Sequence, residues 1–306
     1  MTLVSTKEML RAAMEGHYAV GAFNANNMEQ VQAIVEAAVE ERAPVILQVS
    51  QGAIRYAGLE TAAALVQVIG GRADVPVALH LDHGTDFAQN VRCLRAGFTS
   101  LMFDGSKLPY YENVATTARI AEIAHIVDIP VEAELGRVLQ SEDDVTPEEV
   151  EAAMTDPDQA VDFVARTGCD SLAVAIGSVH AMKEAEAELN IERLKAIHEK
   201  VDIPLVLHGS SGVQEESEVA AIQHGIAKIN VATMLNQGFV RGLKEGMAEM
   251  PDNVDPRKFL AYSRENVKEV VRHKIRLFGG SGQITSSGFA SPSTLHRSAD
   301  LGGLEE

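Results

Sequence analysis

Short apolar runs alternate with longer amphipathic stretches along almost the whole chain. Eight of the runs are typical of buried parallel strands, at residues 19–23, 45–49, 77–81, 100–103, 130–134, 171–176, 205–208 and 228–231. Helical periodicity is found at residues 28–41, 59–69, 87–96, 111–125, 158–167, 191–200, 216–224, 235–250 and 256–278. No linker divides the series, and eight βα units fit a closed barrel better than an open, doubly wound sheet. We therefore predict one α/β domain over residues 1–278, which is a (β/α)8 TIM barrel with extra C-terminal helices.

The end of the chain has a different composition. Residues 279–306 are rich in Gly and Ser, which is typical of a mobile tail. A second exception to the regular alternation is residues 137–156, a long acidic connection after the fifth predicted strand. Long connections on the active face of a barrel often act as lids.

Charge and composition exclude several classes of protein. The formal net charge is −18, which argues against a nucleic-acid partner. Apolar stretches are short and interrupted, so we expect neither a transmembrane helix nor a membrane partner, and the N-terminus lacks the apolar core of a signal peptide. Cys93 and Cys169 do not form a disulfide framework. These features predict a soluble, cytoplasmic protein.

Three histidines stand where predicted strands end. His83 follows VALHLD, His180 follows LAVAIGSV, and His208 follows PLVL. Strand ends of a (β/α)8 barrel open onto one face, where active sites are built. Three imidazoles converging there would supply an open-sided zinc site, although polar residues at strand ends can also be structural. His80 lies within its strand, so we interpret it as a supporting residue behind the ligands.

Carboxylates accompany these histidines. Asp82 directly precedes His83, and it suits either general acid/base work beside a metal or the orientation of a ligand histidine. Asp104 follows the fourth strand, and Glu132 and Glu134 share one side of the fifth. Asp104 and Glu134 could hold a second divalent cation, or they could pair with each other at the rim. The acidic cluster at 142–144 in the long connection is compatible with solvated surface.

The last two βα turns indicate a phosphate site. Residues 208–213 read HGSSGV and residues 229–233 read INVAT. Loops after strands 7 and 8 of such barrels commonly bind phosphate through backbone N–H groups and a helix N-terminus. Gly209 and Gly212 allow a close backbone approach, and Ser210, Ser211 and Thr233 offer hydroxyl donors.

Together these segments resemble the class II, zinc-dependent ketose-bisphosphate aldolases, of the fructose- and tagatose-bisphosphate type. The matching segments occur in the family's order over about the first 240 residues: GAFNANNMEQVQAIVEAA, LHLDHG, GFTSLMFDGS, VEAELG, AVAIGSVH, PLVLHGSSGV and KINVAT. The resemblance implies a lyase of carbohydrate metabolism and glycolysis. It would cleave a phosphorylated ketose between C3 and C4 into dihydroxyacetone phosphate and an aldehyde, reversibly. It also implies a homodimer or homotetramer, and a monovalent cation near the phosphate.

The resemblance assigns roles to individual positions. His83, His180 and His208 match the zinc ligands, and Asp104 and Glu134 match a second metal position. Asp82 matches the proton donor to the C4 oxygen, and Glu142 matches a glutamate that exchanges a proton of dihydroxyacetone phosphate. The matched substrate-binding positions are Asn24, Ser50, Ala181, Gly209, Ser210, Ser211, Asn230, Val231, Ala232 and Thr233.

Within the family, NVAT at 230–233 is more similar to the tagatose-bisphosphate branch. The chain departs from the family pattern in three places. Ala181 replaces a glycine that follows the second zinc histidine in most members, Leu139-Gln140 replaces the usual Gly-Gly of the lid, and the C-terminal tail has no counterpart. The sequence therefore leaves open a different ketose phosphate, modified or monophosphorylated.

The sequence agrees less well with other functions. A Schiff-base aldolase needs a lysine at a strand end, but Lys228 begins its predicted strand and Lys107 lies in a loop. A barrel metallohydrolase needs a His-x-His pair after the first strand, where this chain has GAFNANN. A non-catalytic, aldolase-like subunit also remains an alternative.

Overall fold

The computed structural model describes residues 3–140, 146–180, 187–285 and 288–289. Its main sheet has eight parallel strands in the order β3-β2-β1-β10-β9-β7-β5-β4. The strands are β1 (Val20–Asn24), β2 (Val45–Ser50), β3 (Val77–Asp82), β4 (Leu101–Phe103), β5 (Val131–Leu135), β7 (Ser171–Val174), β9 (Leu205–Leu207) and β10 (Ile226–Val231). The two end strands meet through a parallel bridge between Gly84 and Phe103 and a hydrogen bond from Leu81 N to Ser100 O. The sheet is thus a nearly closed barrel, and the predicted (β/α)8 fold is confirmed.

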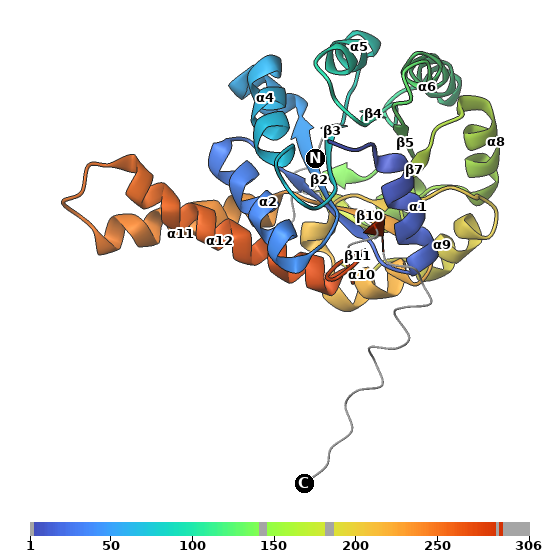
Figure 1. Ribbon diagram of the computed structural model, residues 1–306. Coiled ribbons are helices and arrows are strands. Elements are labelled where there is room, and N and C mark those ends of the chain that lie inside the picture. Colours follow the sequence, from blue (N-terminus) through green and yellow to red (C-terminus); the bar gives the residue numbers. More distant parts are fainter. Residues whose placement is uncertain (1–2, 141–145, 181–186, 286–287, 290–306) are drawn as a thin grey trace.

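Helices surround the barrel on its outside (Figure 1). They are α2 (Met28–Glu41), α3 (Gln51–Ala57), α4 (Leu59–Gly70), α5 (Phe87–Arg95), α6 (Tyr110–His125), α7 (Pro147–Ala153), α8 (Pro157–Thr167), α9 (Ile191–His198), α10 (Glu215–Ile222), α11 (Thr233–Glu249) and α12 (Pro256–Leu277). Side-chain caps fix several starts: Asn27 and Asp86 each accept a hydrogen bond from the first turn of α2 and α5.

The N-terminal helix α1 (Thr6–Gly16) packs against the inside of the barrel rather than its outer face. Its buried residues Met9, Leu10 and Ala13 form a separate apolar cluster with inward-facing residues such as Ala22 and Ile46. An amphipathic helix with these residues on one side can close an open barrel end. The chemistry-bearing residues must therefore be sought at the opposite end.

Two long helices, α11 and α12, form a hairpin that projects sideways from the barrel (Figure 1). Close contact between them depends on glycine. A Cβ atom at Gly242 would lie 2.4 Å from the carbonyl oxygen of Tyr262, so no larger residue fits without moving a backbone.

Some boundaries differ from those predicted. β10 begins at Ile226, so Lys228 lies inside the strand rather than at its start. The long connection after β5 contains a seven-residue helix, α7, held by a capping box between Thr146 and Glu149. Part of the segment predicted as a tail is packed: Ile284 is 6% exposed, and its N–H donates to the carbonyl of Arg42.

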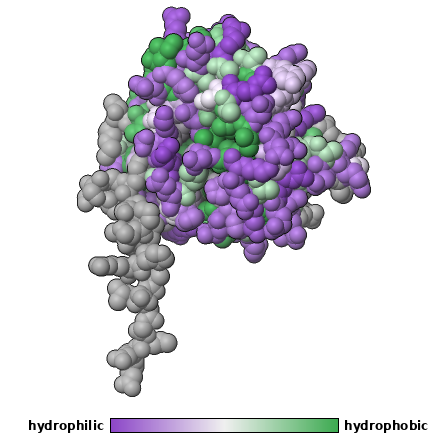
Figure 2. Space-filling model, turned by 90° about the vertical axis from the view of Figure 1, so that its right-hand side faces the viewer, coloured by the Kyte–Doolittle hydropathy of each residue, from purple (hydrophilic) through white to green (hydrophobic). Residues whose placement is uncertain are grey.

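Polar side chains cover most of the face shown in Figure 2, around a smaller hydrophobic area. None of the helices in the described ranges combines the length and apolarity needed to cross a bilayer.

Candidate active site and metal centre

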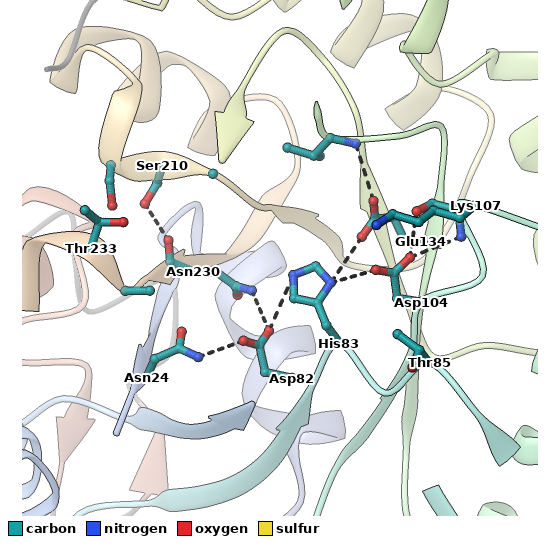
Figure 3. Close-up of a pocket in the computed structure, with 15 residues that line it drawn as sticks. Asn24, Asp82, His83, Thr85, Asp104, Lys107, Glu134, Ser210, Asn230 and Thr233 are labelled. Carbon is teal, nitrogen blue, oxygen red and sulfur yellow. Dashed lines mark hydrogen bonds and ion pairs between the residues drawn. The ribbon is translucent and has the colours of Figure 1, made fainter. Parts of the chain in front are cut away.

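A cavity of about 400 Å³ lies where the barrel strands end. This volume is within the range of small-molecule sites. Figure 3 shows its polar lining residues, which come from most of the strand ends. The lining residues are Asn24, Asp82, His83, Thr85, Asp104, Ser106, Lys107, Glu134, Val138, Gly209, Ser210, Ser211, Asn230, Ala232 and Thr233.

The backbone at the end of β3 brings two successive side chains into this cavity. Consecutive strand residues normally point to opposite faces. His83 instead adopts a left-handed conformation with φ 49°, and Asp82 and His83 both line the cavity. Gly84 follows, where a Cβ atom would lie 2.5 Å from the carbonyl oxygen of Met102. The turn therefore requires glycine, and the strained histidine before it fits a functional position.

The imidazoles of His83 and His208 meet edge to face beside this turn. His208 Nδ1 lies 3.1 Å from His83 Nε2, and the ring centroids are 4.7 Å apart. The other nitrogen of each ring contacts a carboxylate: His83 Nδ1 lies 2.8 Å from Asp104 Oδ2, and His208 Nε2 lies 2.9 Å from Glu132 Oε1. This pattern, with one ring nitrogen bound to a carboxylate and the other directed at a common point, is typical of metal-ligating histidines.

Asp82 is held next to the two histidines by amides. Asn24 Nδ2 donates to Asp82 Oδ2 over 2.7 Å, and Asn230 Nδ2 donates to Asp82 Oδ1 over 3.3 Å. Burial by itself raises the pKa of Asp82, but the charges of His83 and Lys228 and the Asn24 hydrogen bond outweigh it, so the pKa is lowered. Asp82 is therefore an ionised carboxylate in a fixed position.

The carboxylates around His83 and His208 favour a bound positive charge. Burial lowers the pKa of His83, but Asp82, Asp104 and Glu134 outweigh it and raise the pKa to about 10. Burial and the neighbouring Asp104 raise the pKa of Glu134, and its buried Oε2 atom has no hydrogen-bond partner among the described residues. The ligand atoms of Asp82, His83 and His208 all lie within 4.8 Å of one another. The residues present thus fit a divalent cation.

A polar cradle lies on the opposite side of the cavity, after β9 and β10. Gly209 has a left-handed backbone with φ 69°, and it starts a short 3₁₀ turn over Ser210–Gly212. The 17-residue helix α11 begins at Thr233 with no side-chain cap on its first N–H groups. Both Gly209 and Thr233 line the cavity. Uncapped N–H groups and hydroxyls are the donors that bind phosphate.

Known proteins match this chain over nearly its whole length. The model of the class-II fructose-bisphosphate aldolase family matches residues 4–283. The chain belongs to this family. A probable fructose-bisphosphate aldolase of Bacillus subtilis is 47% identical over 286 residues, covering 92% of this chain and all of the relative. The D-tagatose-1,6-bisphosphate aldolase subunit GatY of Klebsiella oxytoca is 43% identical, covering 93% of this chain and all of that subunit. The crystal structure of the YdjI aldolase from Escherichia coli K12 superposes with a TM-score of 0.80 at 36% identity, covering 92% of this chain and 98% of that one. The predicted class II aldolase, a lyase, is confirmed.

The structure gathers most of the residues predicted for an aldolase site. Beneath the cavity lies His208, which is fully buried. Ser50 caps helix α3 through its hydroxyl, and Val231 is buried in β10; neither lines the cavity. His180 ends the short strand β8 (Val179–His180), but its side chain lies outside the described part. Glu142 and Ala181 also lie outside the described residues.

Some lining residues of this aldolase were not predicted from the sequence. Thr85, Ser106 and Val138 stand in loops beyond the strand ends, where no periodic pattern marks them. Ser106 is linked to Asp104, whose Oδ1 accepts hydrogen bonds from the Ser106 backbone and hydroxyl. The only feature of the sequence that could have predicted Ser106 as a site residue is its position two residues after an aspartate at a strand end.

Proposed function

We propose that this aldolase cleaves a phosphorylated ketose, such as fructose or tagatose 1,6-bisphosphate, into dihydroxyacetone phosphate and an aldehyde, and that it catalyses the reverse addition. One observation carries the proposal: the convergence of His208 Nδ1 and His83 Nε2, 3.1 Å apart, beside the fixed carboxylate of Asp82. Relatives named for these two sugars support it.

Zinc is the cation that we propose for the histidine cluster, with His83, His180 and His208 as ligands. A bound zinc ion would polarise the ketose carbonyl and stabilise the enediolate formed on cleavage. Asp104 and Glu134 offer a second divalent position. In the described state, however, Asp104 contacts His83 Nδ1, so it also serves to orient that ring.

Asp82 is the residue that we assign to the proton on the C4 oxygen. Carbon–carbon cleavage requires loss of the C4 hydroxyl proton, and the lowered pKa of Asp82 keeps a carboxylate ready to accept it. In the addition direction the same carboxyl returns that proton to the new C4 oxygen. The hydrogen bond from Asn24 fixes which oxygen of Asp82 faces the substrate.

The remaining site residues are assigned to the substrate phosphate and to the polar pocket. Gly209, Ser211 and the start of α11 at Thr233 would bind the 1-phosphate, with Ser210, Asn230 and Ala232 lining the cavity around it. Ala181 and a monovalent cation belong to the same proposal, whereas Val231, which is buried in β10, would support this end without contacting the substrate. Asn24 lines the cavity beside Asp82 and would act there as a polar pocket residue, whereas Ser50 caps α3 and would act only through that helix. Glu142 would exchange the proton of dihydroxyacetone phosphate.

Schiff-base chemistry finds no support in the described residues. Lys228 is fully buried and does not line the cavity, and Lys107 is the only lysine among the described lining residues. Borohydride added during turnover should therefore trap no lysine adduct. A trapped adduct on Lys107 would contradict the metal-dependent route.

A substrate panel tests the proposed reaction. The purified chain, loaded with zinc, should cleave at least one of fructose bisphosphate, tagatose bisphosphate, their 1-monophosphates and 6-substituted analogues. A chelator should abolish the cleavage, and added zinc should restore it. The relative GatY is called a subunit, so failure of the fully loaded chain alone would favour a non-catalytic, aldolase-like subunit instead.

Assembly and location are part of the same proposal. We expect a homodimer or homotetramer in the cytoplasm, as for a metabolic enzyme of this class. Light scattering of the purified chain, compared with its monomer mass of 32.8 kDa, measures the assembly.

A further inference from the structure

A lysine is buried in the barrel directly beneath the metal centre. Lys228 of β10 and Glu132 of β5 are 0% and 2% exposed, and Lys228 Nζ lies 2.7 Å from Glu132 Oε2. Neither residue lines the cavity, so neither contacts a substrate there. Burying two opposite charges removes the hydration of both ions, and apolar residues of the same volume are often as stabilising. The pair therefore needs an explanation beyond stability.

The second oxygen of Glu132 provides one. His208 Nε2 lies 2.9 Å from Glu132 Oε1 and 3.2 Å from Asn230 Nδ2. Because an ionised carboxylate can only accept, the shorter contact assigns the N–H to Nε2. The lone pair of the neutral ring is then on Nδ1, the atom that lies 3.1 Å from His83 Nε2. The carboxylate thus selects the tautomer of His208 that can bind a metal from the cavity side.

Lys228 is itself held from the other side. Its Nζ lies 3.4 Å from His80 Nε2, and His80 Nδ1 lies 2.7 Å from Ser100 Oγ. Burial and the nearby Lys228 lower the pKa of His80 to about 3, so this ring is neutral and accepts from the ammonium through Nε2. Thr6 of α1 completes the row with a hydroxyl that donates to Ser100 Oγ over 2.9 Å. These contacts link the ammonium of Lys228 to helix α1, which closes the barrel end, and hold the ammonium in place.

We propose that Lys228 and Glu132 are positioning residues for the metal centre: Lys228 fixes the Glu132 carboxylate, and Glu132 directs His208 Nδ1 at the metal. The inference rests on the proposed zinc function, because it assigns a purpose to residues behind one of the ligands. It predicts that the pair sets zinc affinity without touching the substrate.

The fold contains a matched control for Lys228. Lys274 of α12 and Glu218 of α10 form another buried ion pair, with Lys274 Nζ 2.7 Å from Glu218 Oε2 and both side chains at most 2% exposed. Neither residue lines the cavity. Lys228→Met and Lys274→Met make the same change in the two pairs and should both lower the free energy of unfolding.

Zinc affinity should separate these two variants. Competition with a chromophoric chelator at pH 8 measures the zinc dissociation constant of each. We expect Lys228→Met to weaken zinc binding about 10- to 100-fold and Lys274→Met to change it less than about twofold. If the two variants weaken zinc binding to the same extent, or if neither weakens it, the role of Lys228 is overturned.

Two uncharged double variants test the part played by Glu132, and they avoid leaving one buried charge without a partner. Lys228→Met with Glu132→Gln keeps an oxygen that can accept the His208 N–H. Lys228→Met with Glu132→Met removes it at similar volume. The Gln variant should bind zinc about tenfold or more tightly than the Met variant. Equal dissociation constants would overturn the positioning role.

The tautomer can also be read from the unmodified chain. In ¹⁵N-histidine-labelled, zinc-free protein, NMR should show His208 protonated on Nε2, with the signal assigned by its loss in His208→Asn. Protonation on Nδ1 would overturn the inference.

Failure of the proposed function gives a different result. If the wild-type chain binds no zinc, or if His208→Ala binds zinc as tightly as the wild type, the metal centre itself is wrong. If the wild type binds zinc through His208 and only the Lys228 and Glu132 variants fail to change it, the function stands and this inference falls.

Discussion

The Nδ1 atom of His208 lies 3.1 Å from the Nε2 atom of His83, although 125 residues separate the two histidines in the chain. Each ring is turned to this meeting point by a carboxylate on its far nitrogen, Glu132 for His208 and Asp104 for His83. The His208 ring is thus oriented from inside the barrel, and the His83 ring is oriented from the barrel rim.

Removing the metal should remove the activity. Dialysis against a chelator is expected to lower ketose cleavage by at least about 10³-fold, because the proposed zinc ion would supply the electrophile for the carbonyl. Zinc should restore the activity and raise the melting temperature of the zinc-free protein.

The histidine variants provide the control for this experiment. His83→Ala, His180→Ala and His208→Ala should each lose both zinc and turnover, whereas His224→Ala, in the turn between α10 and β10 and outside the cavity lining, should lose neither. Full activity of a variant that binds no zinc would contradict the metal-dependent reaction.

Asp82 should be needed for turnover but not for zinc. Asp82→Ala is expected to lower kcat by about 10²- to 10⁴-fold, which is the usual contribution of a positioned acid or base. Zinc stoichiometry, measured on the purified variant by atomic absorption, should stay at the wild-type value.

Asn24→Ala serves as the graded comparison. It removes the 2.7 Å hydrogen bond to Asp82 Oδ2 but leaves the carboxylate, so we expect a smaller loss of kcat, about tenfold. Near-normal turnover of Asp82→Ala would show that another group moves the proton.

The barrel could be predicted from the sequence because its strands are buried on both faces. Continuous apolar runs and the regular alternation with helices gave all eight strands to within about two residues at each end. Position at a strand end then gathered Asp82, His83 and His208, since strand ends of a barrel share one rim.

The rest of the site depends on contacts that no pattern marks. Lys228 appeared to begin its strand, because Gly225 and the small Ala227 before it weaken the apolar run. Its ion pair with Glu132 joins residues 96 positions apart. Likewise, the left-handed backbone of His83 is what lets Asp82 and His83 share a cavity, and a strand pattern predicts the opposite.

The polar cradle after β9 and β10, to which we assign the substrate phosphate, should control substrate affinity more than turnover. Ser211→Ala and Thr233→Ala each remove a hydroxyl from the cavity wall near the start of α11. A hydrogen bond to a charged group contributes about 1.5–3 kcal/mol, so KM for a 1-phosphorylated ketose should rise about 10-fold or more.

Inorganic phosphate offers a direct measure of the same site. Competitive inhibition by phosphate should weaken in both variants and remain unchanged in Ser217→Ala, a serine of α10 that does not line the cavity. An effect of equal size in Ser217→Ala would argue against the assigned cradle.

Glu218 should make the stability of the fold depend on pH. Burial raises the pKa of Glu218 to about 7, against the attraction of Lys274, whereas the pKa of a glutamate in the unfolded chain is near its ordinary value of 4.5. The folded chain therefore holds this proton more tightly. The resulting stabilisation is complete below pH 4.5 and is lost as the pH rises through 7, by about 3 kcal/mol in total.

Urea unfolding between pH 5 and 8 measures this effect. The free energy of unfolding of the wild type should decline over this range, and Glu218→Gln should lack the part of the decline that comes from Glu218. Glu216→Gln, an exposed change on the same helix, should keep the wild-type dependence. A Glu218→Gln curve parallel to that of the wild type would mean that Glu218 is already ionised throughout this range.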